Sequence, residues 1–147
     1  MKKIKFEDLP SQNSPINATN LNQMQDNIEN AINNTGEWQD LEIINGWENY
    51  DTSIFYPGQI KKDKSRIYLR GVLKLDNKTD NIIAYLPEEY RPEKALMLPA
   101  ITNITHETQE ARRLTVYPDG RVLFSYETTI TEVTGYVSID GLYFDID

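Results

Sequence analysis

The sequence contains no cysteine, so disulfide bonds, thiolate zinc sites and cysteine nucleophiles are all excluded. Histidine is nearly absent as well. His106 stands alone, and its surroundings carry no nucleophile-elbow pattern. A single histidine is too few ligands for a zinc site, and we interpret His106 as an ordinary surface residue. We therefore expect no metal, no cofactor and no enzymatic activity.

Long apolar runs are also missing. None approaches the roughly 20 residues that a helix needs to span a bilayer. The basic N-terminus, residues 1–7, lacks the apolar stretch of a signal peptide. The chain carries 23 acidic and 15 basic residues, a net charge of −8, which repels nucleic-acid phosphates and anionic lipids. We expect no nucleic acid, no membrane insertion, and synthesis in the cytoplasm.

Two short basic stretches, Arg112–Arg113 and Lys61–Lys64, are interpreted as solvated surface. Hydrophobic residues make up 39% of the 147 residues, which predicts a modest core. A modest core favours self-association, because a partner chain can bury apolar surface that one chain leaves exposed.

The first 36 residues divide into an arm and a helix. Pro10 and Pro15 rule out a continuous helix over residues 1–16, which we predict to be an extended attachment arm. Residues 17–36 are predicted to form a helical segment, with Asn17 as N-cap and Gly36 as the residue just past the C-terminus.

The apolar residues of this helix form one narrow stripe. Leu21, Met24, Ile28 and Ala31 recur at spacings of three and four, and most other positions are Asn, Gln, Asp or Glu. Such a stripe is typical of a coiled-coil seam. A short helix rich in asparagine is marginal alone in water. The segment is therefore predicted to pack against other copies of itself.

From Trp38 onward the pattern changes to the period of two that is typical of β-strands. In the segment 66–75, Ile67, Leu69, Leu73 and Leu75 fall on one face. Further short strands are separated by proline, glycine and aspartate. Hairpin turns are predicted at residues 118–120 and 140–141. We predict a mainly β protein, with a β-sandwich or jelly-roll-like head domain over residues 37–147.

Carboxylate clusters give weak signals for chemistry. Glu88 and Glu89 are adjacent, and in an extended segment they would point to opposite faces, so they would not share a glycosidase site. The stretch 76–81 has oxygen ligands, but Lys78 and the missing central glycine depart from a calcium loop. A plain turn is the preferred interpretation of that stretch.

Aromatic residues are concentrated just after the helix. Trp47, Tyr50 and Tyr56 are the candidate ligand-binding residues, because saccharide sites stack sugar rings on aromatic faces. The alternative is that these rings fill the small core. That alternative is as probable for Trp47 and Tyr50 as ligand binding, and it is the preferred interpretation of Trp38.

Several short stretches share one resemblance: residues 6–10, 15–25, 28–32, 71–73, 83–92, 119–122 and 136–144. They resemble parts of the tail-fibre, baseplate and receptor-binding proteins from phages of Gram-positive bacteria. The most specific is the string Leu-Pro-x-x-Tyr-Arg-Pro, at residues 86–92. Together they span nearly the whole chain, although the chain is short and has no long fibre shaft. Whether it is a fibre tip or an adaptor stays open.

The resemblance implies a protein of the virion tail that forms a homotrimer, with a trimer interface at Leu21, Met24, Ile28 and Ala31. It also implies β domains that contact either a host cell-wall polysaccharide or teichoic acid, or another tail or baseplate protein. Our first hypothesis is a trimeric receptor-binding module for host adhesion through carbohydrate binding. The second is a structural tail or baseplate connector with protein partners only. A cell-wall hydrolase ranks last.

Overall fold

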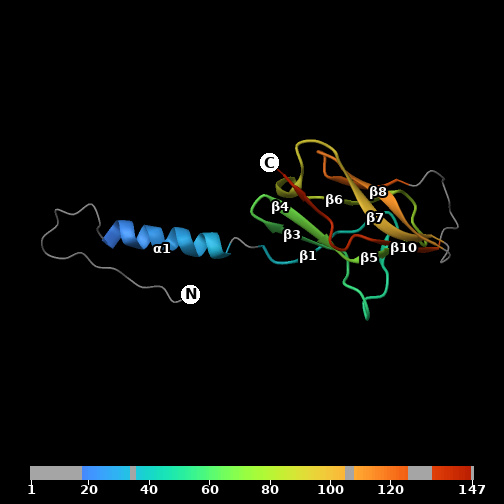
Figure 1. Ribbon diagram of the computed structural model, residues 1–147, viewed down its shortest axis with the longest axis horizontal. Coiled ribbons are helices and arrows are strands. Elements are labelled where there is room, and N and C mark those ends of the chain that lie inside the picture. Colours follow the sequence, from blue (N-terminus) through green and yellow to red (C-terminus); the bar gives the residue numbers. More distant parts are fainter. Residues whose placement is uncertain (1–17, 34–35, 105–107, 126–133, 147) are drawn as a thin grey trace, which may run out of the picture. The chain divides into compact units, whose positions relative to one another are not determined.

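The structure is a computed structural model that describes residues 18–33, 36–104, 108–125 and 134–146 (Figure 1). The chain divides into two compact units, Met1–Gly36 and Glu37–Asp147. In the first unit, helix α1 spans Ala18–Asn33. The arm, Asn17 and the only histidine lie outside the described residues. No helix of the described part is long and apolar enough to cross a membrane.

The second unit consists of short strands in two antiparallel sheets. The four-stranded sheet has the order β1-β3-β4-β11, and the seven-stranded sheet has the order β2-β5-β10-β7-β8-β9-β6 (Figure 1). The strands are β1 (Gln39–Asp40), β2 (Glu48–Asn49), β3 (Gln59–Asp63), β4 (Arg66–Arg70), β5 (Val72–Lys74), β6 (Ile82–Tyr85), β7 (Leu96–Ile104), β8 (Thr108–Val116), β9 (Arg121–Phe124), β10 (Gly135–Ser138) and β11 (Tyr143–Asp145). The predicted mainly β fold with one short N-terminal helix is confirmed.

One hydrophobic core joins the two sheets. The four-stranded sheet contributes inward side chains such as Ile67, Leu69 and Phe144, all at most 4% exposed. The seven-stranded sheet contributes others, among them Leu114 and Phe124, both fully buried. Because strands of both sheets bury alternate residues against the same core, the domain has the layered arrangement of a β-sandwich.

The segment predicted as one strand over residues 66–75 is two strands in different sheets. β4 ends at Arg70 in the four-stranded sheet, and β5 begins at Val72 in the seven-stranded sheet. Gly71, between them, has a φ of 121°. A Cβ there would clash with the carbonyl oxygen of Pro57 and lie 2.6 Å from the amide nitrogen of Gly58. Only glycine lets the chain change sheets at this point.

The predicted hairpin at Asp140–Gly141 is also wrong. β10 pairs with β5 and β7, whereas β11 pairs with β4 in the other sheet. The turn is therefore a second crossing between the sheets. Hydrogen bonds join this crossing to the crossing at Gly71. The Gly71 amide donates to Asp140 Oδ1 at 2.7 Å, and the Ile139 amide donates to the Gly71 carbonyl at 2.9 Å.

The hairpin predicted at residues 118–120 is confirmed. β8 and β9 pair in register from Val116↔Val122 onward. Gly120 has a φ of 94°, and its amide donates to the Tyr117 carbonyl at 2.9 Å. The turn thus uses the positive φ that glycine supplies at low cost.

The string at residues 86–92 forms a structural corner next to this hairpin. The Leu86 amide donates to the Gly120 carbonyl at 2.8 Å, and Arg91 Nε donates to the Leu86 carbonyl at 2.8 Å. Glu88 and Glu89 begin the 3₁₀ helix Glu88–Tyr90 and are both exposed, so the extended segment expected there is not present. The most specific string of the resemblance therefore serves the fold.

The stretch 76–81 uses its oxygens within the chain. Asp76 Oδ1 accepts a hydrogen bond from the Gly135 amide at 3.2 Å, and Asp80 Oδ1 accepts one from the Ile82 amide at 2.9 Å. Lys78 Nζ donates to Asn81 Oδ1 at 2.9 Å. These contacts are those of a turn that positions β6 and β10.

Candidate functional site

The outer face of the four-stranded sheet concentrates aromatic and basic side chains. Alternation along β3 and β4 turns apolar residues inward and leaves Lys61, Tyr68 and Arg70 on the other side. Lys61 pairs with Tyr68 across the two strands, and Tyr68 also pairs with Tyr143 of β11. We call the following set the basic–aromatic face: Trp38, Tyr56, Lys61, Tyr68 and Arg70.

Arg70 lies over two aromatic rings. Its guanidinium carbon lies 4.2 Å from the centroid of the Trp38 ring and 3.9 Å from that of Tyr56. Its Nε donates to Gln59 Oε1 at 2.8 Å, and Gln59 Nε2 donates to Asp40 Oδ1 at 2.7 Å. These contacts fix the guanidinium in one orientation, because a planar cation stacks well on aromatic faces.

Lys61 adds a second cation to the same face. Its Nζ lies 5.1 Å from the centroid of the Trp38 ring and 5.4 Å from that of Tyr68. Among the described residues, neither Lys61 nor Arg70 has a carboxylate oxygen within the 4.0 Å of an ion pair. In a chain of net charge −8, this face therefore carries local positive charge.

A neighbouring arginine on the same sheet shows the contrasting arrangement. Arg66 stacks on Tyr143 at 4.6 Å, but its Nε also donates to Asp145 Oδ1 at 2.9 Å. The hydrogen bond from Arg66 holds the pKa of the Asp145 carboxyl below its usual value. Arg66 and Asp145, together with residues 63–65 and Tyr68, line an open depression of about 500 Å³. The positive charge of Arg66 in this depression is largely neutralised by the Asp145 carboxylate.

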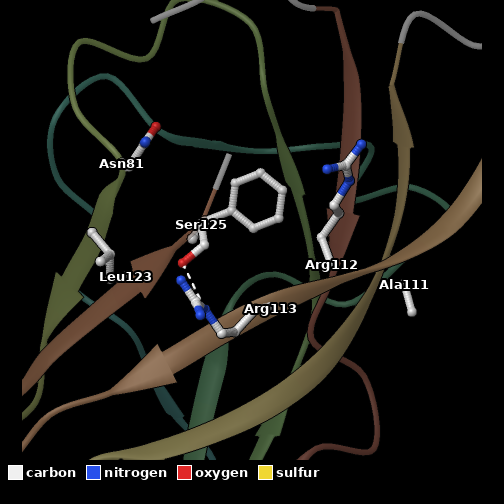
Figure 2. A pocket seen from close by; sticks show the side chains of 7 residues that line it. Asn81, Ala111, Arg112, Arg113, Leu123 and Ser125 are labelled. Atoms are coloured by element: carbon white, nitrogen blue, oxygen red, sulfur yellow. Dashed lines mark hydrogen bonds between the residues drawn. The ribbon is translucent and has the colours of Figure 1, made fainter. Parts of the chain in front are cut away.

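A second depression lies on the seven-stranded sheet and has a volume of about 520 Å³. In Figure 2, Arg113 points toward Ser125, and its Nε donates to Ser125 Oγ at 3.1 Å. Arg112 is turned elsewhere and is ion-paired with Glu110. The depression is lined by Asn81, Ala111, Arg112, Arg113, Leu123, Phe124 and Ser125. It offers a few hydrogen-bonding groups but no exposed aromatic ring for a sugar to stack on.

Of the three ligand-binding residues predicted from the sequence, only Tyr56 lies on the basic–aromatic face, where it is 59% exposed. Trp47 is 3% exposed, donates from Nε1 to the Asp80 carbonyl at 2.9 Å and packs edge-on against Phe124. Tyr50 is half-buried, with its ring 5.4 Å from that of Tyr136. We therefore do not include Trp47 and Tyr50 in the candidate site.

Sequence reasoning missed most of this face. Trp38 was assigned to the core, yet it lies beside Lys61 and Arg70. The signal was present in the segment 66–70, whose outward positions are Arg, Tyr and Arg. Lys61 belongs to a run interpreted as solvated surface. The run of lysines indicates a ligand-binding surface only when the neighbouring strand, and with it Tyr68 beside Lys61, is known.

The helix carries the residues predicted to form a trimer interface. Met24 is 59% exposed and Ile28 is 51% exposed, while Leu21 is half-buried. Ala31 belongs to α1, but its side chain lies outside the described residues. Large apolar side chains thus remain available on this helix for contact with a partner.

A solved structure has the same fold as this chain: the receptor binding protein (gp15) of Listeria phage PSA. The two structures match with a TM-score of 0.60 and 14% sequence identity, over 86% of this chain and 74% of that chain. No protein-family model matches the sequence, and no curated protein matches it. At this identity the likeness establishes the fold. The chain thus shares its fold with a phage receptor-binding protein.

Proposed function

We propose that this protein is a phage tail receptor-binding protein, located in the virion, that adheres to a saccharide on the host cell surface. The fold likeness to a receptor-binding protein supports the adhesive role. The resemblance of short sequence stretches to tail proteins points in the same direction. Neither observation names a ligand, so the chemistry must be argued from the site.

The observation that carries the proposal is the basic–aromatic face. Trp38, Tyr56 and Tyr68 supply rings on which sugar rings stack. Arg70 and Lys61 supply donors for the hydroxyl groups of a sugar. Aromatic and basic side chains on the outer face of a sheet suit a repeating polymer better than a small enclosed molecule.

The proposal includes a homotrimer built on α1. The exposed side chains of Met24 and Ile28 supply apolar surface for a helical seam. A trimer would present three copies of the basic–aromatic face. Three weak sugar contacts that act together bind far more tightly than one, because the second and third contacts form at high effective concentration.

A wall-binding assay tests the proposal. We expect the fluorescently labelled protein to bind purified cell walls of at least one Gram-positive host, and Tyr68→Ala to lower the apparent affinity about tenfold or more. The matched control is Tyr117→Ala, which removes another half-buried tyrosine ring that lies beside a cation, Arg121 at 4.5 Å, in the turn between β8 and β9. The absence of binding to every wall tested, or equal losses in both variants, would refute the proposal.

A structural connector is the second candidate, and one observation favours it. Met97 and Ile101 of β7 are 68% and 55% exposed, with Pro99 between them on the same face. Apolar side chains grouped on the outside of a central strand are typical of protein–protein contacts. Binding to purified neighbouring tail proteins that is lost in Met97→Glu, without any binding to cell walls, would favour the connector.

A further inference from the structure

Within the part of the chain that the structure describes, the two terminal nitrogens of Arg70 have no hydrogen-bond partner. The guanidinium lies over two aromatic rings, with its central carbon 4.2 Å from the centroid of Trp38 and 3.9 Å from that of Tyr56. Nε is engaged with Gln59. Because a guanidinium donates hydrogen bonds only in its own plane, the free donors form a fork that points out of the stack.

We infer that Arg70, assisted by Lys61, is an oxyanion-binding site that takes a phosphate or carboxylate group of the ligand. A fork of two parallel N–H donors matches the two oxygens of such a group. Lys61 Nζ and the Arg70 guanidinium both lie within about 5 Å of the same indole ring. The inference that this anion is carried by a saccharide rests on the proposed function.

The other stacked arginines show why this site is distinct. Arg66 stacks on Tyr143 and is paired with Asp145 at 2.9 Å. Arg121 stacks on Tyr117 and is paired with Asp119 at 2.8 Å. Each of these two cations already has an anionic partner from its own chain.

Arg70 reaches the carboxylate of Asp40 only through an intervening side chain, that of Gln59. Asp40 accepts a hydrogen bond from Gln59, and it is Gln59, an uncharged amide, that contacts Arg70. The chain therefore orients the guanidinium without neutralising it. Lys61, also without a carboxylate partner in the described part of the chain, raises the local potential further. An anion of the ligand would therefore supply the negative partner of these two cations.

Small matched probes test the site in the full-length protein. Glycerol 1-phosphate represents a phosphate group and glucuronate represents a carboxylate, with glycerol and glucose as their uncharged counterparts. We expect at least one charged probe to bind in a titration followed by NMR, to bind more tightly than its uncharged counterpart, and to weaken as salt is added. The stronger of the two charged probes identifies the anion.

Variants connect this binding to the named residues. Arg70→Gln and Lys61→Gln should each weaken the charged probe about tenfold, while Arg70→Lys, which keeps the charge but not the fork, should lose less. Arg121→Gln is the matched control and should bind like the wild type, because that stacked arginine already has its carboxylate. Charged probes that bind no better than uncharged ones, or Arg70→Gln and Lys61→Gln variants that both bind like the wild type, would overturn the inference.

The wall-binding assay separates this inference from the proposed function. Host walls that are bound by the wild type and equally well by Arg70→Gln would leave the adhesive role standing and overturn the oxyanion site. Probe binding that depends on Arg70, without binding to any host wall, would support the site and count against the proposed function.

Discussion

Gly71 provides the most direct test of how the two sheets are joined. With a φ of 121°, it occupies backbone space that residues with a Cβ avoid, and alanine there costs about 2 kcal/mol in backbone strain. The added Cβ would also clash with the Pro57 carbonyl and crowd the Gly58 amide, which costs about another 2 kcal/mol. We therefore expect Gly71→Ala to lower the free energy of unfolding by about 4 kcal/mol and Tm by about 15 °C.

Gly141→Ala is the matched control for this prediction. Gly141 has a φ of 75°, but a Cβ added there would have no atom within 4 Å among the described residues other than its chain neighbours. It should therefore show the backbone cost alone, about 1 kcal/mol. The assay is chemical denaturation of the full-length protein at one fixed concentration, because self-association makes stability depend on concentration. Equal losses for the two variants would refute the close crossing of the chain at Gly71.

Ile28→Asp should convert the proposed trimer into monomers in light scattering. Asn27→Asp, at an exposed position outside the apolar stripe of α1, should leave the trimer assembled. An Ile28→Asp variant that stays trimeric would exclude α1 as the trimer interface. Trp47→Phe should cost about 2 kcal/mol in denaturation, because the buried indole loses its hydrogen bond to the Asp80 carbonyl and part of its packing, and wall binding should persist. A folded Trp47→Phe variant that no longer binds cell walls would show that Trp47 contributes to ligand binding. The hydrogen bond from Arg66 lowers the pKa of Asp145 from 3.8, so its contribution to stability is present above pH 3.8 and is lost as the pH falls through the lower folded pKa. Tm measured from about pH 5 to pH 2 should fall less steeply in Asp145→Asn, and identical curves would contradict this linkage.

Local chemistry was sufficient to predict part of the fold. The hairpin at residues 118–120 follows from a proline, an aspartate and a glycine in sequence, which favour one turn regardless of the rest of the chain. Ile67 and Leu69 were predicted to share a buried face, and both are at most 1% exposed. Period-two alternation determines which side chains are buried before any pairing is known.

The two crossings between the sheets could not be predicted in this way. Alternation looks the same on either side of Gly71, although β4 and β5 belong to different sheets. The turn at Asp140–Gly141 has the composition of a hairpin, yet the strands on either side pair with distant partners. Which strand a segment pairs with depends on contacts far away in the sequence, and turn residues carry no information about it.

The candidate site was predictable only in part for the same reason. Tyr56 was identified by its type. Trp38, which was expected in the core, lies beside two cations, and Trp47, for which the core and ligand binding were equally expected, is buried. The sequence does not show which side chains lie beside each tryptophan in the folded chain. Only after folding do Asp80 and Phe124 contact the indole of Trp47, and Lys61 and Arg70 that of Trp38.

The chain enters the β domain on the same sheet that carries the basic–aromatic face. Trp38 directly precedes β1, which is joined to β3 through the pairs Gln39↔Ile60 and Asp40↔Gln59. A pull on the chain from its N-terminal side would therefore load the two pairs between β1 and β3, and then the ladder between β3 and β4, before it reached Tyr68 and Arg70. For the proposed adhesive role, the strength of these two ladders would contribute to the force at which a bound ligand is lost.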